Sequence, residues 1–229
     1  MAKKTKKTRK ELLKEPDEFM NLTGKLIRFA TEHKNQITSA VGIIVALALI
    51  FSGYRFFSIR SERKASALLD QGLAKYEQFR NDNKPVEAYD QVSADFQMIL
   101  EKYGDKQNGK IARLTYANIC YNAGKYEQAI ELYKRSLKDF EKHQAIHSQV
   151  VGSLGYAYEQ QADYASAVTY FEQLSSAPDA ITRGEALYRL GWLYDKLGNA
   201  EKSKAAYEKI ISDHQDFIYI DLVKERMAG

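Results

Sequence analysis

Apolar residues recur every three or four positions along most of the chain, which places them on one face of an α-helix. Short breaks containing Gly, Pro, Asn or Asp divide these stretches into segments of helical length. No segment of similar length alternates apolar and polar positions with β-branched enrichment, as a half-buried strand would. The pattern therefore predicts an all-α fold.

A run without charged residues precedes these segments. Residues 35–54 are uncharged and dense in Ile, Val, Leu and Ala, and Lys34 and Arg55 bracket them. Twenty residues of helix span about 30 Å, the thickness of the hydrocarbon core of a bilayer. The leader is long and no small-residue cleavage motif follows the run, so a cleaved signal peptide is disfavoured. The sequence thus predicts a retained transmembrane helix over residues 37–57.

Positive charge is concentrated before the predicted span. Residues 1–36 carry ten Lys or Arg and five Asp or Glu, whereas residues 58–229 carry 23 and 25. The positive-inside rule predicts a cytoplasmic N-terminus and a C-terminal domain on the other side of the membrane. In a Gram-negative bacterium, that side is the periplasm. Because this larger segment is not basic, nucleic acid is not expected as a ligand.

The basic tail also contains a candidate amphipathic helix. Pro16 followed by two acids is a typical helix start, and Phe19, Leu22 and Leu26 recur at helical spacing. Such a helix would lie flat on the inner leaflet or form an ordinary short helix, and the pattern leaves both interpretations open.

The segment after the span contains internal repeats. Residues 110–142, 145–177 and 180–212 repeat small and aromatic residues in the same order, with a weaker copy before them. Four aromatic residues are spaced 37, 38 and 36 positions apart: Phe96, Tyr133, Phe171 and Tyr207. This period is slightly longer than the 34 residues of a tetratricopeptide helix–turn–helix repeat. The chain resembles that family over roughly residues 86–214, and the resemblance implies an α-solenoid.

Residue size at the repeated positions indicates how the helices pair. Ala117, Gly155 and Gly191 would let the first helix of each pair approach the second closely, and the large aromatics would fill the gap between successive pairs. The predicted organisation is a basic cytoplasmic tail (1–36), a transmembrane helix (37–57), membrane-proximal helices forming a degenerate repeat (58–104), three tetratricopeptide-like repeats (110–214) and a capping helix (216–229).

Chemistry-bearing motifs are absent from the sequence. It has no nucleophile elbow, phosphate loop, H-E-x-x-H or dinucleotide fingerprint, so we expect no enzyme, no cofactor and no small-molecule substrate. His143 and His147 lack a third ligand at suitable spacing and are not expected to bind metal. Cys120 falls at a core position of its repeat, where a free cysteine packs as a small apolar residue.

The concave side of such a solenoid is lined by the first helix of each pair. Aromatic residues at these positions, where a solvated face is expected, indicate a surface that binds a protein partner. The alternative is that the capping helix or residues 59–79 cover them. The predicted groove consists of Leu114, Asn118, Tyr121, Gln149, Tyr156, Tyr188, Trp192 and Lys196.

Some members of the tetratricopeptide family hold acidic C-termini with a clamp of Lys, Asn and Arg on these faces. Asn118 and Arg189 match that clamp in part, but Leu114, Ser153 and Glu185 occupy its remaining places. The sequence therefore argues against this route of binding.

The order of basic tail, single span and repeat domain resembles the YfgM-like family of bacterial inner-membrane proteins, ancillary subunits of the Sec translocon. The resemblance implies a single-pass protein whose periplasmic domain works with the translocon or an anchored chaperone on exported proteins. Two alternatives stay open. One is a scaffold of an envelope or respiratory complex that makes contacts through Gly42-x-x-x-Ala46, and the other is an anchored cytosolic adaptor of inverted orientation.

Overall fold

The computed structural model describes residues 18–80, 84–177 and 180–228. Within these ranges the chain forms ten α-helices and no strand, which confirms the all-α prediction. The basic run before residue 18, including the expected helix start at Pro16, lies outside the described residues. The helices are α2 (Glu18–Glu32), α3 (Lys34–Arg80), α4 (Pro85–Tyr103), α5 (Gln107–Asn122), α6 (Tyr126–Asp139), α7 (Gln144–Gln160), α8 (Tyr164–Leu174), α9 (Ala180–Lys196), α10 (Ala200–Asp213) and α11 (Ile220–Ala228).

The chain divides into two units, Met1–Ile59 and Arg60–Gly229. In the first unit the apolar side chains of α3 are exposed, with 60% of Leu47 and 68% of Ile50 accessible. Helix α3 is long and apolar enough to cross a membrane, and none of its apolar window is buried, so it is a candidate membrane span. The predicted span and the membrane-proximal helix are one continuous helix, because no proline interrupts the chain between them.

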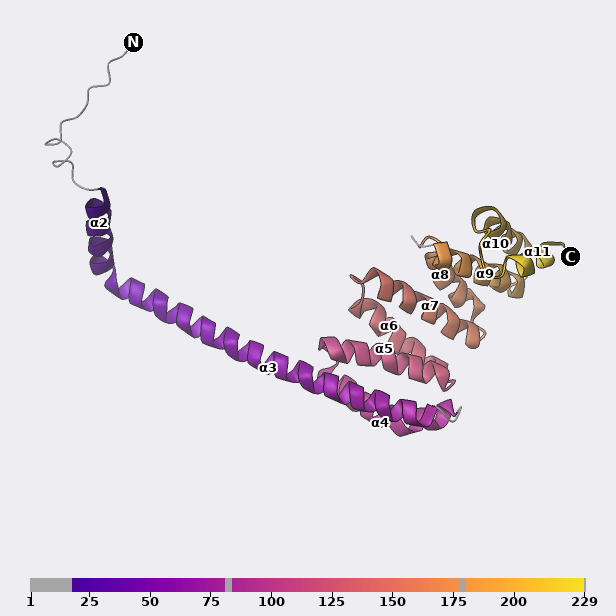
Figure 1. The fold of residues 1–229 in the computed structure, drawn as a ribbon, viewed down its shortest axis with the longest axis horizontal. Helices are drawn as coiled ribbons and strands as arrows, with labels where there is room; N and C mark the ends of the chain where they lie inside the picture. Colours follow the sequence, from indigo (N-terminus) through magenta and orange to yellow (C-terminus); the bar gives the residue numbers. More distant parts are fainter. Residues whose placement is uncertain (1–17, 81–83, 178–179, 229) are drawn as a thin grey trace, which may run out of the picture. The chain divides into compact units, whose positions relative to one another are not determined.

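The second unit consists of helix pairs (Figure 1). Helix α5 packs on α6, α7 on α8 and α9 on α10, and each pair contacts the next through α6 and α7 or through α8 and α9. The later part of α3 packs beside α4, where Lys75 and Asp95 form an ion pair of 2.9 Å. No pair buries its apolar face alone, so stability comes from stacking.

Glycine allows close contact with an aromatic ring inside two of the repeats. A Cβ atom on Gly155 would lie 2.8 Å from the ring of Phe171, and one on Gly191 would lie 2.4 Å from the ring of Tyr207. Both rings are buried against the first helix of their own pair. The sequence correctly predicted close approach at the small residues. It was wrong about these two rings, which fill space within a pair and not between successive pairs.

The pair formed by α3 and α4 shows the same arrangement. A Cβ atom on Gly72 would lie 3.1 Å from the ring of Phe96. Phe96 also stacks on Tyr116 of the next pair, with ring centroids 5.4 Å apart. This ring therefore joins two neighbouring pairs.

The turns between paired helices share one backbone conformation. Gly124 and Gly198 both have φ of +73°, and Ala162 takes the corresponding place in the middle pair with φ of 59°. Glycine adopts this left-handed region without steric cost, whereas alanine is strained there. The glycines thus end the first helix of two pairs.

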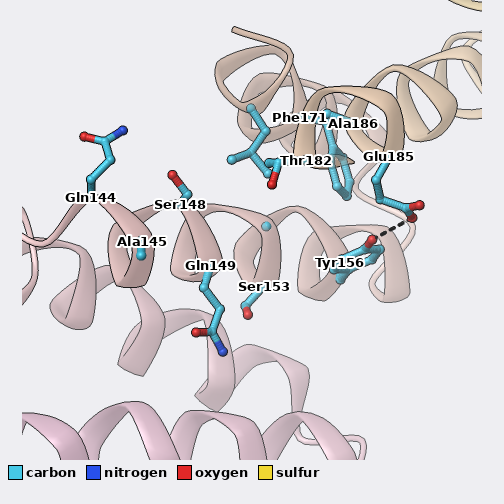
Figure 2. Close-up of a pocket in the computed structure, with 12 residues that line it drawn as sticks. Gln144, Ala145, Ser148, Gln149, Ser153, Tyr156, Phe171, Thr182, Glu185 and Ala186 are labelled. Carbon is cyan, nitrogen blue, oxygen red and sulfur yellow. Dashed lines mark hydrogen bonds between the residues drawn. The ribbon is translucent and has the colours of Figure 1, made fainter. Parts of the chain in front are cut away.

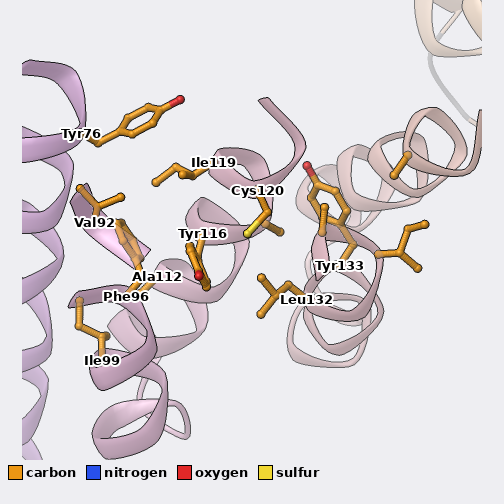
Figure 3. Packing of buried hydrophobic residues seen from close by; sticks show 14 of the residues in the cluster. Tyr76, Val92, Phe96, Ile99, Ala112, Tyr116, Ile119, Cys120, Leu132 and Tyr133 are labelled. Carbon is orange, nitrogen blue, oxygen red and sulfur yellow. The ribbon is translucent and has the colours of Figure 1, made fainter. Parts of the chain in front are cut away.

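Buried aromatic and aliphatic residues fill the core between α3 and α7 (Figure 3). Cys120 is fully buried among them, as its position predicted. Burial raises the pKa of its thiol to about 12, so the reactive thiolate is scarce. Helix α11 begins at Ile220, later than the expected capping helix, and buries Val223.

Asp139 at the end of α6 forms ion pairs with two residues of α5, Arg113 and, at 4.0 Å, Lys110. Arg113 pairs with Asp139, and its second guanidinium nitrogen donates to the carbonyl oxygen of Gly104 at 2.9 Å. Only 13% and 16% of the two side chains are accessible. The repeat family often has Trp at the position of Arg113, and the charge is accommodated here because its partner is buried with it.

Candidate protein-binding groove

Two adjoining cavities of about 680 and 380 Å³ lie along α7. They share Gln149, Ser153 and Tyr156 as lining residues, and together they are here called the α7 groove. The larger cavity is lined by Gln144, Ala145, Ser148, Gln149, Gly152, Ser153, Tyr156, Phe171, Leu174, Thr182, Glu185 and Ala186. The smaller is lined by Asn118, Tyr121, Asn122, Tyr133, Gln149, Ser153 and Tyr156.

The larger cavity combines apolar and polar surfaces (Figure 2). Phe171 and Leu174 come from α8, and Ala186 comes from α9. Small residues on α7 leave the space open, and serine hydroxyls and glutamine amides stand along the same helix. Hydroxyl and amide groups both donate and accept hydrogen bonds, so this wall suits the backbone of an extended polypeptide.

A polar cluster lies where α7 meets α9. The hydroxyl of Tyr156 donates to Oε1 of Glu185 at 2.9 Å (Figure 2). Arg189 donates through Nε to the same oxygen at 3.1 Å and through Nη1 to Oε1 of Glu159 at 3.4 Å. Its guanidinium carbon lies 4.9 Å from the centroid of the Tyr156 ring. These four residues are called the Arg189 cluster.

The electrostatics of this cluster are dominated by burial. Burial raises the pKa of the Glu159 carboxyl, the positive charge of Arg189 opposes the rise, and the negative charge of Glu185 adds to it. Burial likewise raises the pKa of Tyr156 to about 12. Oε2 of Glu159 is buried and accepts no hydrogen bond from the described residues. A buried acceptor without a donor is unusual in a folded protein and costs about 1–3 kcal/mol.

Half of the groove residues expected from the sequence line the α7 groove. Asn118 and Tyr121 line the smaller cavity, and Gln149 and Tyr156 line both. Oδ1 of Asn118 accepts a hydrogen bond of 2.7 Å from the hydroxyl of Tyr133. These residues come from α5, α6 and α7, so repeat stacking brings them together.

The other expected groove residues lie elsewhere. Leu114 is partly buried against the core. Tyr188 contacts the rings of Phe217 and Tyr219, with centroids 5.9 and 5.4 Å away. The segment before α11 therefore covers Tyr188 in part. This agrees, for Tyr188, with the alternative in which the capping region covers the predicted groove residues.

Trp192 and Lys196 form a separate contact at the end of α9. The Trp192 ring meets Tyr164 of α8 edge to face at 5.7 Å. Nζ of Lys196 lies 5.3 Å from the centroid of Trp192. Neither residue is among those that line the two cavities. Their role in binding stays a prediction.

The Arg189 cluster was missed at the sequence level. Glu185 and Arg189 are four residues apart on one helix, a spacing that signals an ion pair. The contact with Glu159 depends on how the pair of α7 and α8 stacks on α9 and has no local signal. Arg189 matched an acid-binding clamp in sequence, yet the carboxylates of Glu159 and Glu185 already engage its guanidinium.

The histidines singled out in the sequence lie at the turn between α6 and α7. His143 meets Phe140 edge to face at 6.2 Å, and His147 is half-buried in the first turns of α7. Across the described residues, no group of three or more His, Cys, Asp or Glu is placed to hold a metal ion.

Comparison with known families identifies the repeats. Tetratricopeptide repeat models match residues 117–142, 151–180 and 185–216, which fall within α5–α10 and the turns that follow them. The second unit thus contains tetratricopeptide repeats, and the predicted solenoid class is confirmed. These repeats are protein-interaction modules in general.

Particular relatives add little to that assignment. No curated protein matches the chain. Among solved structures, the crystal structure of BtubC (BKLC) from P. vanneervenii is similar, with 12% identity over 70% of this chain and 74% of that one and a TM-score of 0.41. A likeness at this level gives no information about function.

Proposed function

We propose that this protein is a membrane-anchored adaptor whose α7 groove binds an extended segment of a protein partner. The observation that carries the proposal is that the two cavities adjoin on α7 and together draw lining residues from α5, α7 and α9, the first helices of three consecutive pairs. Two adjoining cavities lined by apolar side chains, hydroxyls and amides fit a polypeptide better than a compact metabolite.

A membrane anchor would lower the affinity that the groove needs for its partner. The exposed apolar part of α3 supports residence in a bilayer. Confinement to a membrane raises the effective concentration of the groove towards other anchored proteins. Modest affinity is then sufficient for selective association.

The charge distribution and the resemblance to YfgM-like proteins support a finer proposal. The protein is a single-pass component of a bacterial inner membrane, with its N-terminus in the cytoplasm and its repeats in the periplasm. Its partner is a Sec translocon component or an anchored periplasmic chaperone that assists exported proteins. The region comprising residues 58–104 acts as a first, degenerate repeat.

Site-specific photocrosslinking of the full chain in native membranes tests the groove. A photoreactive amino acid at Gln149, which is exposed and lines both cavities, should yield a discrete protein adduct. Ser148→Trp should reduce the adduct at least about fivefold by filling the larger cavity. Ser212→Trp on the exposed face of α10 is the matched control and should leave it unchanged.

The same experiment separates the proposal from the scaffold alternative. Adducts confined to probes within residues 38–57 would favour a scaffold that acts through the span. A second photoreactive amino acid, placed at Ser212, would reject the groove if it gave as much adduct as the one at Gln149. Reporter fusions at both termini test the orientation. A periplasmic N-terminus would reject the proposed location.

A further inference from the structure

The charge of the α7 groove is unbalanced. Among the described residues that line the larger cavity, Glu185 is the charged one. Behind it, the Arg189 cluster sets the two carboxylates of Glu159 and Glu185 against a single guanidinium. A groove of this kind attracts a cation and disfavours a carboxylate, because opposite charges attract strongly where water is excluded.

One carboxylate oxygen of the Arg189 cluster has no hydrogen-bond donor among the described residues. The side chain of Glu159 is only 10% exposed, and its Oε2 is buried without a hydrogen bond from the described residues. Arg189 reaches the opposite oxygen of this carboxylate at 3.4 Å, which is a long contact. Glu159 lines neither cavity, so a donor that enters the groove meets the cluster at Glu185, which lines the larger cavity and whose side chain is 31% exposed.

The surroundings suit a long basic side chain. The alkyl stem of Lys or Arg packs on apolar surface while its charged head seeks polar groups, and the ring of Phe171 and the side chain of Ala186 provide such surface in the same cavity. Tyr121 lines the adjoining smaller cavity. Its ring offers a further attraction for a cation.

We propose that the Arg189 cluster is a subsite for a Lys or Arg side chain carried by the extended segment that the groove binds. This inference rests on the proposed function and adds the chemistry of the partner. The partner segment carries a basic residue flanked by small or apolar residues. Acidic C-terminal segments are excluded by the same charges.

Binding of defined peptide libraries to the purified full chain in detergent tests the subsite. Three fluorescein-labelled libraries differ only in a fixed central residue, which is lysine, its uncharged isostere norleucine, or glutamate. Fluorescence anisotropy should show the lysine library binding about tenfold more tightly than the norleucine library, and the glutamate library binding most weakly. Added salt should reduce the preference for lysine.

Two isosteric variants locate the effect. Glu159→Gln and Glu185→Gln keep an acceptor for Arg189 and Tyr156 but remove one negative charge each. Either should abolish the preference for lysine over norleucine. Glu208→Gln on the exposed face of α10, where Glu208 contacts Lys204 at 3.8 Å, is the control and should keep the preference.

Failure of the subsite and failure of the groove give different results. Equal binding of all three libraries that Ser148→Trp abolishes would overturn the cationic subsite and leave the groove as the binding site. Absence of binding by every library, or binding that Ser148→Trp leaves intact, would overturn both. Circular dichroism of each variant checks that helicity is retained.

Discussion

The two units of this protein use apolar residues in opposite ways. In the first unit the large apolar side chains from Leu22 to Ile59 are exposed along α2 and α3. In the second unit residues of the same kind, such as Leu154 and Phe171, are almost fully buried between paired helices. Helical hydrophobic periodicity is therefore informative only together with the charge content of each stretch.

Charges differ between the units in a matching way. The apolar stretch of α3 contains none over residues 35–54, as a membrane span requires, because lipid offers no partner for a charge. The repeat core contains Arg113, because Asp139 is buried beside it. Glycine differs too: a Cβ atom on Gly42 would meet no atom of the described residues within 4 Å, whereas one on Gly191 would press on a ring. Each contrast leads to a test.

The largest effect is expected from charges placed in the apolar stretch. Ile44→Arg combined with Leu47→Arg should move the protein from the carbonate-resistant membrane fraction to the soluble fraction, because each charge costs about 2.5–3.5 kcal/mol at a helix centre. Membrane fractionation measures this. Ile218→Arg, at an exposed site before α11, is the control. Retention of the double variant in the membrane would contradict the anchor.

An identical substitution in each unit should have unequal effects on stability. Phe171→Ala should lower the free energy of unfolding of the repeats by about 3–5 kcal/mol, because it leaves a cavity beside Gly155. Phe57→Ala, where 68% of the side chain is exposed, should change it by less than about 0.5 kcal/mol. Urea unfolding of the full chain in detergent, followed by circular dichroism, provides both values. Equal losses would show that the two environments do not differ as described.

The buried ion pair should respond differently to single and double changes. Asp139→Asn leaves Arg113 without its counterion and should cost about 2 kcal/mol of unfolding free energy. Arg113→Leu combined with Asp139→Leu should restore stability to within about 1 kcal/mol of the parent chain. The same urea experiment measures both. A double variant less stable than Asp139→Asn would mean that the pair stabilises the repeat beyond neutralising a buried charge.

The smallest effect is expected at glycine. Gly191→Ala adds a methyl group against Tyr207 and should cost about 1 kcal/mol, since the clash exceeds the gain in helix propensity. Gly42→Ala meets open space and should leave membrane retention unchanged. Thermal unfolding of the repeats and fractionation give the two results. A stabilised Gly191→Ala variant would show that the ring moves at little cost.

Local features explain what could be predicted from the sequence. The uncharged run and the repeat period are properties of short stretches, so they gave the anchor candidate, the helix pairs and the buried Cys120. Asn118, Tyr121, Gln149 and Tyr156 followed from repeat phase alone. The end of the predicted span at residue 57 is not marked by any break in α3, because a helix in water and a helix in lipid share one backbone geometry.

Contacts between distant elements explain what was missed. The partial cover of Tyr188 depends on the path of residues 214–219, which have no helical periodicity that fixes their position. The approach of Glu159 to Arg189 arises only when the pair of α7 and α8 stacks on the pair of α9 and α10. Such contacts follow from the curvature of the solenoid, and single-sequence patterns do not encode it directly.

The chain contains a single cysteine, and packing hides its thiol. Maleimide dyes should therefore not react with the Cys120 thiol in the folded protein. They should label it only when α5 separates from its neighbours. Cysteines introduced on the surface can then carry fluorophores without removal of the native one. The slow labelling of Cys120 itself then measures how often the repeats open transiently.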